Sequence, residues 1–228
     1  LCEYQDRGII TSMESRTRAY IKIQEGCDRF CTYCLIPFAR GQVRSRNPRE
    51  VIAEAEALIG KGFKELILTG INTALYGSEE DFAEKYPDFR PELSGVEKIL
   101  AEIEELSGDF RIRLSSLEPT VVDGDYAQGL MKYSRLCHHL HLSAQSGSDH
   151  VLRLMNRPYT RNDYLDIVRR LRDSDPNYGI TTDMIAGFPQ ETPEVEDLRP
   201  TISSDLTDGE TIHKESRVFS VYAEDYKE

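Results

Sequence analysis

The sequence lacks the features of a secreted or membrane protein. Its five cysteines are too few, and three of them lie too close together, to form a disulfide framework. It has no apolar run near the length of a membrane span, and no signal peptide opens the chain. We therefore expect a protein of the reducing cytoplasm that has no membrane partner.

Positive charge is also scarce. The chain has 28 Lys and Arg against 40 Asp and Glu, a net charge of −12, which argues against binding of nucleic acid over the whole surface. The exception is local, because Arg40, Arg44, Arg46 and Arg49 fall within ten residues that contain no acid. We predict that the first three contact substrate or phosphate; a solvated basic loop is the alternative.

The length indicates one large domain. With 228 residues and 26.1 kDa the chain can bury a substantial core, and α/β barrels often use this length as one unit. Residues 1–18 are polar without periodicity and are expected to be a linker into a domain of residues 19–228, whose pattern degrades from Pro193 onward. Because Leu1 is not an initiator methionine, we expect a fragment of a longer protein.

One loop carries most of the chemical information. Cys27, Cys31 and Cys34 have the spacing C-x3-C-x2-C, and a loop this short can aim three thiolates at one point if they share a metal centre. A disulfide would leave one thiol over. The candidates are a zinc site with a fourth ligand from elsewhere, or a four-iron, four-sulfur cluster with one open iron. The next Cys or His along the chain is the distant Cys137.

Five apolar or alternating segments predict β-strands, and helical periodicity lies between them. The strands are expected at 19–24, 65–69, 111–115, 139–143 and 180–185, and the helices after the N-caps Asn47, Ser94 and Thr160, with a weaker helix at 124–133. Residues 73–93 show no periodicity that predicts an element. Strands that alternate with helices predict a parallel sheet.

A polar or glycine-rich turn follows each predicted strand. These turns are the cysteine loop and residues 69–72, 115–118, 145–147 and 187–191. Because ligands lie at the carboxyl ends of parallel strands, we expect the five turns to form one site. The predicted fold class is α/β, a partial (β/α)6 TIM-like barrel in which the sixth unit, with a strand at 217–222, is not clearly defined by the pattern.

The cysteine loop, with the aromatic Tyr33 just before its last cysteine, resembles the signature of the radical S-adenosylmethionine (SAM) enzymes. Longer blocks at 111–119, 139–149 and 181–189 resemble one family among them, the radical SAM methylthiotransferases. Residues 68–77 are most similar to the branch that acts on N6-threonylcarbamoyladenosine at position 37 of tRNA. Sister branches act on isopentenyladenosine in tRNA or on a ribosomal-protein aspartate.

The resemblance implies cofactors, a mechanism and partners. Cys27, Cys31 and Cys34 would hold a 4Fe-4S cluster whose open iron chelates SAM. An electron would then release a 5′-deoxyadenosyl radical, which takes hydrogen from adenine C2 before a methylthio group is inserted. The implied partners are tRNA and a reducing electron donor such as flavodoxin or ferredoxin.

The resemblance also implies a set of SAM contacts. Tyr33 would contact the adenine, Arg157 would pair with a carboxylate, and Gly187 and Pro189 would shape the wall near the adenine. The other expected cofactor contacts are Gly70, Asn72, Ser116, Glu118, Gln145 and Ser146. Packing, a turn or a surface salt bridge is the structural alternative for these residues. His139 and His141 are expected to be hydrogen-bonded interior side chains and not ligands.

The sequence departs from the family in several places. Full-length members carry an amino-terminal domain with three further cysteines and a carboxyl-terminal RNA-binding β-barrel, which are absent here, and Ala144 and Gln190 interrupt the usual pattern. We therefore expect the isolated chain to be incomplete for full turnover, with tRNA bound through the absent domains. Another radical SAM reaction, or a non-catalytic metal-stabilised RNA-binding fragment, stays open as an alternative.

Overall fold

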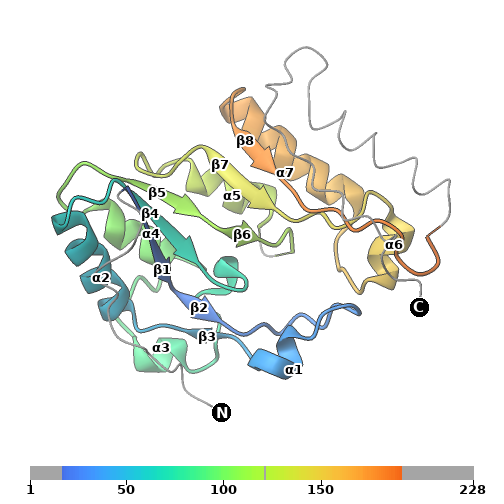
Figure 1. Ribbon diagram of the computed structural model, residues 1–228, viewed down its shortest axis with the longest axis horizontal. Coiled ribbons are helices and arrows are strands. Elements are labelled where there is room, and N and C mark those ends of the chain that lie inside the picture. The colour runs from blue at the N-terminus through green and yellow to red at the C-terminus, as the bar shows by residue number, and fades with distance from the viewer. Residues whose placement is uncertain (1–16, 121, 192–228) are drawn as a thin grey trace. The chain divides into compact units, whose positions relative to one another are not determined.

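The computed structural model describes residues 17–120 and 122–191 (Figure 1). The chain divides into two compact units, which we treat separately. Within the described ranges, the first unit contains residues 17–30, 34–117 and 129–138, and the second contains residues 31–33, 118–120, 122–128 and 139–191. The cysteine loop thus contributes residues to both units.

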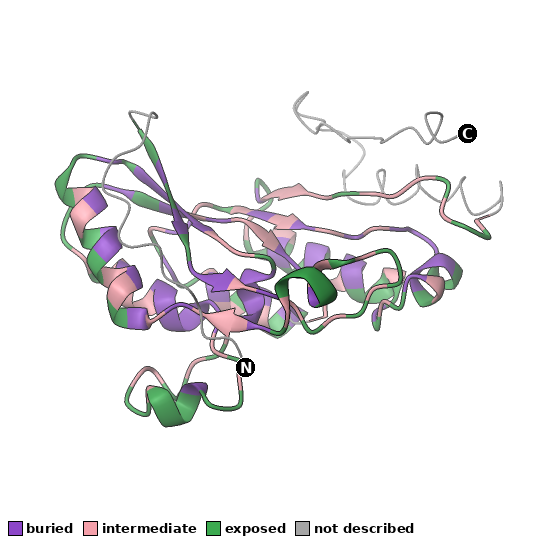
Figure 2. Cartoon of the chain, turned by 60° about the horizontal axis from the view of Figure 1, so that its bottom comes forward, coloured by how far each residue is buried: buried purple, intermediate pink, exposed green. Residues whose placement is uncertain are grey.

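A parallel sheet covered by two helices forms the core of the first unit. Its strands are β1 (Arg18–Lys22), β4 (Glu65–Thr69) and β5 (Arg111–Leu114), in the order β1-β4-β5. One face of this sheet is fully apolar, and the buried stripes of α2 (Pro48–Gly60) and α4 (Glu97–Glu104) supply the rest of the core (Figure 2). The buried sheet residues are Ala19, Ile21, Leu66, Leu68, Ile112 and Leu114.

Short elements surround the cysteine loop in the first unit. β2 (Gln24–Glu25) pairs with β3 (Arg44–Ser45) in antiparallel fashion, and α1 (Ile36–Arg40) lies between them in sequence. The region at 73–93, for which no element was predicted, contains η1 (Thr73–Leu75) and α3 (Phe82–Lys85), and β6 (Ser116–Leu117) follows β5. The rings of Tyr76 and Tyr86 pack on Phe82, with centroids 5.6 and 5.0 Å away, which gives this region an apolar centre.

The second unit contains β7 (His139–Leu142) and β8 (Gly179–Thr181), which pair in parallel, with α6 (Asp149–Leu154) and α7 (Arg161–Ser174). The Thr160 hydroxyl accepts a hydrogen bond from the Asp163 amide, and the Asp163 carboxylate accepts one from the Thr160 amide. This capping box fixes the start of α7, as predicted. The predicted weak helix is α5 (Gly124–Leu130).

The α/β class is confirmed, and a strand lies at each of the five predicted places, but β8 ends at Thr181 and not at 185, and one helix start is wrong. Ser94 does not cap α4; the helix begins at Glu97 after Val96, and no side chain caps it. The Glu97 carboxylate instead pairs with Lys132 at 2.8 Å and accepts a hydrogen bond from Tyr133 at 3.3 Å. Within the described part of the chain the strands close no barrel. The predicted linker of residues 1–18 ends too late, because Arg18 is the first residue of β1. The rest of it up to residue 16, the degraded pattern from Pro193 and the sixth strand at 217–222 lie outside the described residues.

Candidate functional site

The start of the cysteine loop lies against the chain that returns from α1. The Cys27 amide donates to the Gly41 carbonyl at 3.0 Å, next to the β2–β3 pairing. Gly26 has a φ of +74°, and a Cβ at this position would lie 1.9 Å from the Gln42 carbonyl oxygen. Only glycine fits there, because the conformation is strained for other residues and the space is already filled by backbone.

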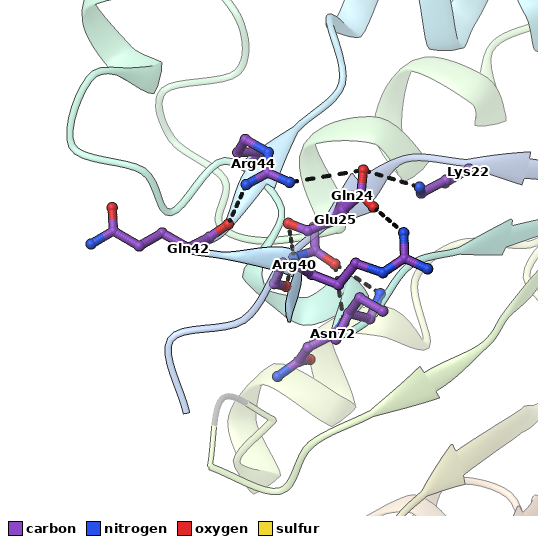
Figure 3. A network of polar contacts seen from close by, with 9 residues as sticks. Lys22, Gln24, Glu25, Arg40, Gln42, Arg44 and Asn72 are labelled. Atoms are coloured by element: carbon purple, nitrogen blue, oxygen red, sulfur yellow. Dashed lines mark hydrogen bonds and ion pairs between the residues drawn. The ribbon is translucent and has the colours of Figure 1, made fainter. Parts of the chain in front are cut away.

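A buried side chain that the sequence did not single out, Gln24, connects this loop to the turn after β4 (Figure 3). Its Oε1 accepts hydrogen bonds from the Ile71 and Asn72 amides, both at 3.0 Å. Its Nε2 donates to the carbonyls of Glu25 at 2.9 Å and Gly26 at 2.7 Å. One amide therefore holds the predicted site residue Asn72 and the start of the cysteine loop.

Gly70 gives this amide the room that it needs. A Cβ on Gly70 would lie 2.9 Å from Gln24 Oε1 and 3.1 Å from Gln24 Cβ. Ser116, the third predicted cofactor contact in the first unit, lies in β6, and its carbonyl is 3.5 Å from the hydroxyl of Thr73 in η1. The turn after β4 and the strand β6 are thus in contact within this unit.

The arginines of the acid-free run, Arg40, Arg44, Arg46 and Arg49, were expected to form a cationic rim, and part of this charge is neutralised. Glu25 accepts a hydrogen bond from Arg40 at 2.8 Å and lies 3.2 Å from Lys22 and 3.9 Å from Arg44 (Figure 3). Burial alone would raise the pKa of Glu25, but the hydrogen bonds and charges of these three partners lower it below its ordinary value. Arg40 and Arg44 therefore share one carboxylate, and half or more of the Arg40 side chain stays exposed.

Arg46 does not belong to an exposed rim. Its side chain is 4% exposed and pairs with Glu54 of α2, which is 1% exposed. The Arg46 carbonyl accepts a hydrogen bond from the Tyr76 hydroxyl at 2.7 Å. These contacts indicate a structural role for Arg46. Because its side chain is buried, its exposure does not support the predicted contact with substrate or phosphate.

In the second unit, the middle of the cysteine loop is attached to the end of α6. The Thr32 amide donates to the Met155 carbonyl at 3.2 Å, and the Thr32 hydroxyl donates to the Leu154 carbonyl at 2.9 Å. The ring of Tyr33 meets the ring of Phe188 edge to face, with centroids 6.1 Å apart. Phe188 lies between the predicted site residues Gly187 and Pro189, so this unit brings Tyr33 and that turn together.

A buried ion pair lies in the same unit. Arg157 hydrogen-bonds Glu118, and their side chains are only 7% and 9% exposed. The guanidinium also lies 5.6 Å from the centre of the Tyr159 ring. Burial alone would lower the pKa of Arg157, but Tyr159, Tyr33 and Glu118 raise it. Arg157 thus pairs with a carboxylate of its own chain, in contact with a buried tyrosine that sequence reasoning missed.

The other predicted residues of the second unit form tight turns. Gln145 has a φ of +63°, its amide donates to the Asp183 carbonyl at 2.9 Å, and its carbonyl accepts from the Ile185 amide at 2.8 Å. Ser146 is buried, and its hydroxyl accepts from the Ser148 amide at 3.2 Å. Gly187, with a φ of +72°, precedes a turn in which Phe188 donates its amide to Glu191.

The two histidines of β7 are hydrogen-bonded, as expected. His141 lies 3.0 Å from the Thr181 hydroxyl and 3.2 Å from the Asp183 carboxylate, and His139 lies 3.2 Å from Thr181. Within the described ranges, no group of three or more His, Cys, Asp or Glu side chains is arranged to hold a metal ion. No helix in those ranges is long and apolar enough to cross a membrane.

The chemistry of the cysteines suits an iron–sulfur cluster. Cys27, Cys31 and Cys34 form no disulfide and are of intermediate exposure, so none is sealed from solvent. Iron–sulfur clusters are held by such cysteines as thiolates. The assignment of these three residues as ligands rests on their spacing and on the family of the chain.

The family model of the Radical SAM superfamily matches residues 21–199. The chain belongs to the radical SAM superfamily. The matched range includes the three cysteines and every residue that the sequence predicted for the SAM site. The radical SAM resemblance inferred from the cysteine loop is therefore confirmed, and with it the family's use of a 4Fe-4S cluster and SAM.

Curated relatives place the radical SAM chain near the methylthiotransferases. It is 43% identical over 182 residues to a threonylcarbamoyladenosine tRNA methylthiotransferase, MtaB, of Thermotoga maritima, covering 79% of this chain and 39% of the relative. It is 38% identical over 187 residues to a tRNA-2-methylthio-N(6)-dimethylallyladenosine synthase of Clostridium tetani, covering 82% of this chain and 39% of the relative. The chain thus spans about two fifths of the length of the curated relatives it matches.

Solved structures of radical SAM enzymes share the fold. The chain matches the methyltransferase TsrM of Kitasatospora setae with a TM-score of 0.55 at 19% identity, over 81% of this chain and 34% of the other. It matches the coproporphyrinogen III oxidase HemN of Escherichia coli with a TM-score of 0.54 at 16% identity, over 83% and 41%. At these identities the likeness concerns the fold alone, and it confirms the predicted radical SAM type of α/β fold.

Proposed function

We propose that this chain is the radical SAM core of a methylthiotransferase that converts N6-threonylcarbamoyladenosine at position 37 of tRNA to its 2-methylthio derivative. The observation that carries the proposal is the 43% identity over 182 residues to a relative of that name. When bound, the cluster and SAM supply an adenosyl radical able to activate adenine C2. The proposed partners are tRNA and a low-potential electron donor, in the cytoplasm where tRNA is found.

In this proposal the residues of the chain bind, orient and exclude water. Cys27, Cys31 and Cys34 are the cluster ligands. Arg40 and Arg44, which keep exposed surface, are the phosphate contacts. The other proposed SAM contacts are Tyr33, Gly70, Asn72, Ser116, Glu118, Gln145, Ser146, Arg157, Gly187 and Pro189. The Arg157–Glu118 pair beside Tyr33 and Tyr159 supports a polar wall of fixed geometry, because a buried ion pair holds its two side chains in one arrangement.

The cluster and SAM are tested by anaerobic reconstitution of the chain with iron and sulfide. We expect about four irons per chain, an electron paramagnetic resonance spectrum that changes when SAM is added, and release of 5′-deoxyadenosine. Cys31→Ala should lose the iron and the spectrum. Cys137→Ala is the matched control, because Cys137 is also a free thiol of intermediate exposure but lies outside the loop, and it should keep both.

Two results would overturn the enzyme proposal: zinc in place of iron, or a cluster whose spectrum is indifferent to SAM. Equal iron loss in Cys31→Ala and Cys137→Ala would remove the ligand assignment. Zinc together with RNA binding would support the non-catalytic module.

A second candidate function has its own observation, since the chain is 38% identical to a dimethylallyladenosine-modifying relative. A polypeptide that restores the length of the curated relatives should be given two anticodon stem–loops, one with the threonylcarbamoyl and one with the dimethylallyl group. Mass spectrometry should find the methylthio product on the first. Product on the second alone would favour the sister branch, and SAM cleavage with neither product would favour another radical SAM reaction.

A further inference from the structure

An exposed apolar patch lies on the cysteine loop and α1. It consists of Phe30, Leu35 and Phe38, whose exposed fractions are 57%, 76% and 77%. Of the six large hydrophobic residues exposed in the described part of the chain, four fall within residues 30–38. In α1, residues 38–40 are exposed, whereas Ile36 is intermediate and Pro37 is buried (Figure 2). Large apolar side chains gathered on a surface mark an interaction site, because their exposure otherwise costs free energy.

The geometry of the two rings favours flat partners. The centroids of Phe30 and Phe38 lie 5.8 Å apart, and the ring planes meet at 72°. The two rings therefore present faces in different directions. Such an arrangement suits bases that are splayed out of a stack, which is how proteins recognise single-stranded loops of RNA.

The local charge also favours a polyanion. Arg46 is buried against Glu54, so residues 25–49 contribute four other arginines against two acids, a local charge of +2 in a chain of −12. These arginines are Arg29, Arg40, Arg44 and Arg49. A positive strip beside exposed rings is the usual combination in proteins that bind single strands, where cations follow the backbone and aromatic side chains stack on bases.

We propose that Phe30 and Phe38 form a stacking platform for the unpaired bases that flank the target adenosine in the anticodon loop. The proposal rests on the proposed function, because the target base must come close to the loop of Cys27, Cys31 and Cys34, and Phe30 lies between two of these residues. The flanking bases then meet the patch, and the phosphates between them meet Arg40 and Arg44. Stacking is tolerant of sequence, since every base has a π-face.

The test uses an anticodon stem–loop RNA with 2-aminopurine next to the target adenosine and the polypeptide that restores the length of the curated relatives. The fluorescence of 2-aminopurine falls when it stacks, so we expect quenching on binding. Phe38→Ala and Phe38→Leu should weaken binding about tenfold or more and abolish the quenching, whereas Phe38→Trp should keep both. Leu35→Ala is the matched control, because it removes an equally exposed apolar side chain that has no ring.

The variants separate a stacking platform from an apolar contact with another protein surface. If Phe38→Leu kept the affinity while Leu35→Ala lost it, apolar area and not the ring would matter, and the proposal would fail. Absence of quenching in the unmodified chain would also overturn it. Thermal unfolding of each variant checks that the fold is intact, which is expected because Phe38 is 77% exposed.

The failure of this inference can be told apart from failure of the proposed function. Iron content and 5′-deoxyadenosine release are measured on the unmodified chain without RNA. A chain that cleaves SAM but does not quench 2-aminopurine keeps the radical SAM chemistry on which the proposed function depends and loses the platform. A chain that holds no cluster loses the proposed function, and quenching without it would leave an RNA-binding surface alone.

Discussion

The two units hold the cysteine loop by contrasting means. In the first unit, Gln24 is completely buried and makes four hydrogen bonds to backbone, and Gly26 sits where no Cβ fits. In the second unit, exposed Thr32 makes two hydrogen bonds to carbonyls at the end of α6. Water can replace an exposed hydrogen bond but not a buried one. The first attachment should therefore be rigid and costly to change, and the second adjustable.

The largest effect is expected from Gly26→Ala. The new Cβ would lie 1.9 Å from the Gln42 carbonyl oxygen, and alanine would be forced into a φ of +74°. The backbone conformation alone costs about 1–3 kcal/mol, and the clash with backbone adds to it. We expect the free energy of unfolding to fall by about 3 kcal/mol or more, with poor iron incorporation. Denaturant unfolding and iron analysis measure the two effects.

Gly60→Ala is the matched control for this variant. Gly60 is the last residue of α2, and nothing lies within 4 Å of a Cβ built on it. Alanine is a better helix former than glycine, so the control should be neutral or slightly stabilising. If both variants unfolded alike, the first unit would not hold the loop rigidly and the contrast between the units would disappear.

Local sequence patterns predicted the elements that depend on residues close together in the sequence or on apolar residues of any kind. β4 occupies 65–69, as predicted, because a run of apolar residues buried on both sides leaves little choice of boundary. The capping box of α7 was predicted because its two residues, Thr160 and Asp163, satisfy each other within one turn. In these cases the residues that decide the structure are neighbours in the sequence.

Residues whose partners are distant in sequence could not be predicted in this way. The alternation at 19–24 did not single out Gln24, because its Oε1 accepts from backbone amides 47 and 48 residues further along. The spacing from Ser94 to Glu97 matches a capping box, but Lys132 and Tyr133 take the carboxylate. Arg46 lies in an acid-free run, but it pairs with Glu54 of α2, and both side chains are buried. Each depends on tertiary contacts that no local pattern contains.

A smaller effect is expected from Thr32→Val in the second unit. The substitution keeps the shape of the side chain and the backbone hydrogen bond to Met155, and removes only the hydroxyl bond to Leu154. One exposed hydrogen bond contributes about 0.5–1 kcal/mol. We expect a loss within that range in denaturant unfolding, together with faster amide hydrogen exchange at residues 31–33.

Thr32→Ser serves as the control, because it keeps the hydroxyl and should keep most of the protection from exchange. A loss in Thr32→Val as large as that in Gly26→Ala would contradict the comparison. It would mean that the second unit, and not the first, determines where the loop lies.

The smallest effect on stability is expected at Glu25 of the first unit, whose carboxylate forms ion pairs with Lys22, Arg40 and Arg44 (Figure 3). Because the pKa of Glu25 is lowered in the folded chain, its stabilisation is present above the ordinary value of 4.5 and is lost as the pH falls through the lowered value. The side chains of Lys22 and Arg40 are about half exposed, so the contribution should be only a few tenths of a kcal/mol.

Glu25→Gln should therefore reduce the free energy of unfolding slightly at pH 7 and by less at pH 3, which lies below the ordinary pKa of 4.5. Urea unfolding at both values measures the difference, and about 1 M salt should shrink it at pH 7 by screening the exposed cations. An equal loss at both pH values would mean that the side chain acts through hydrogen bonds and not through charge. Glu25 would then be held as rigidly as Gln24, and the first unit would have no adjustable ion pair next to its cysteines.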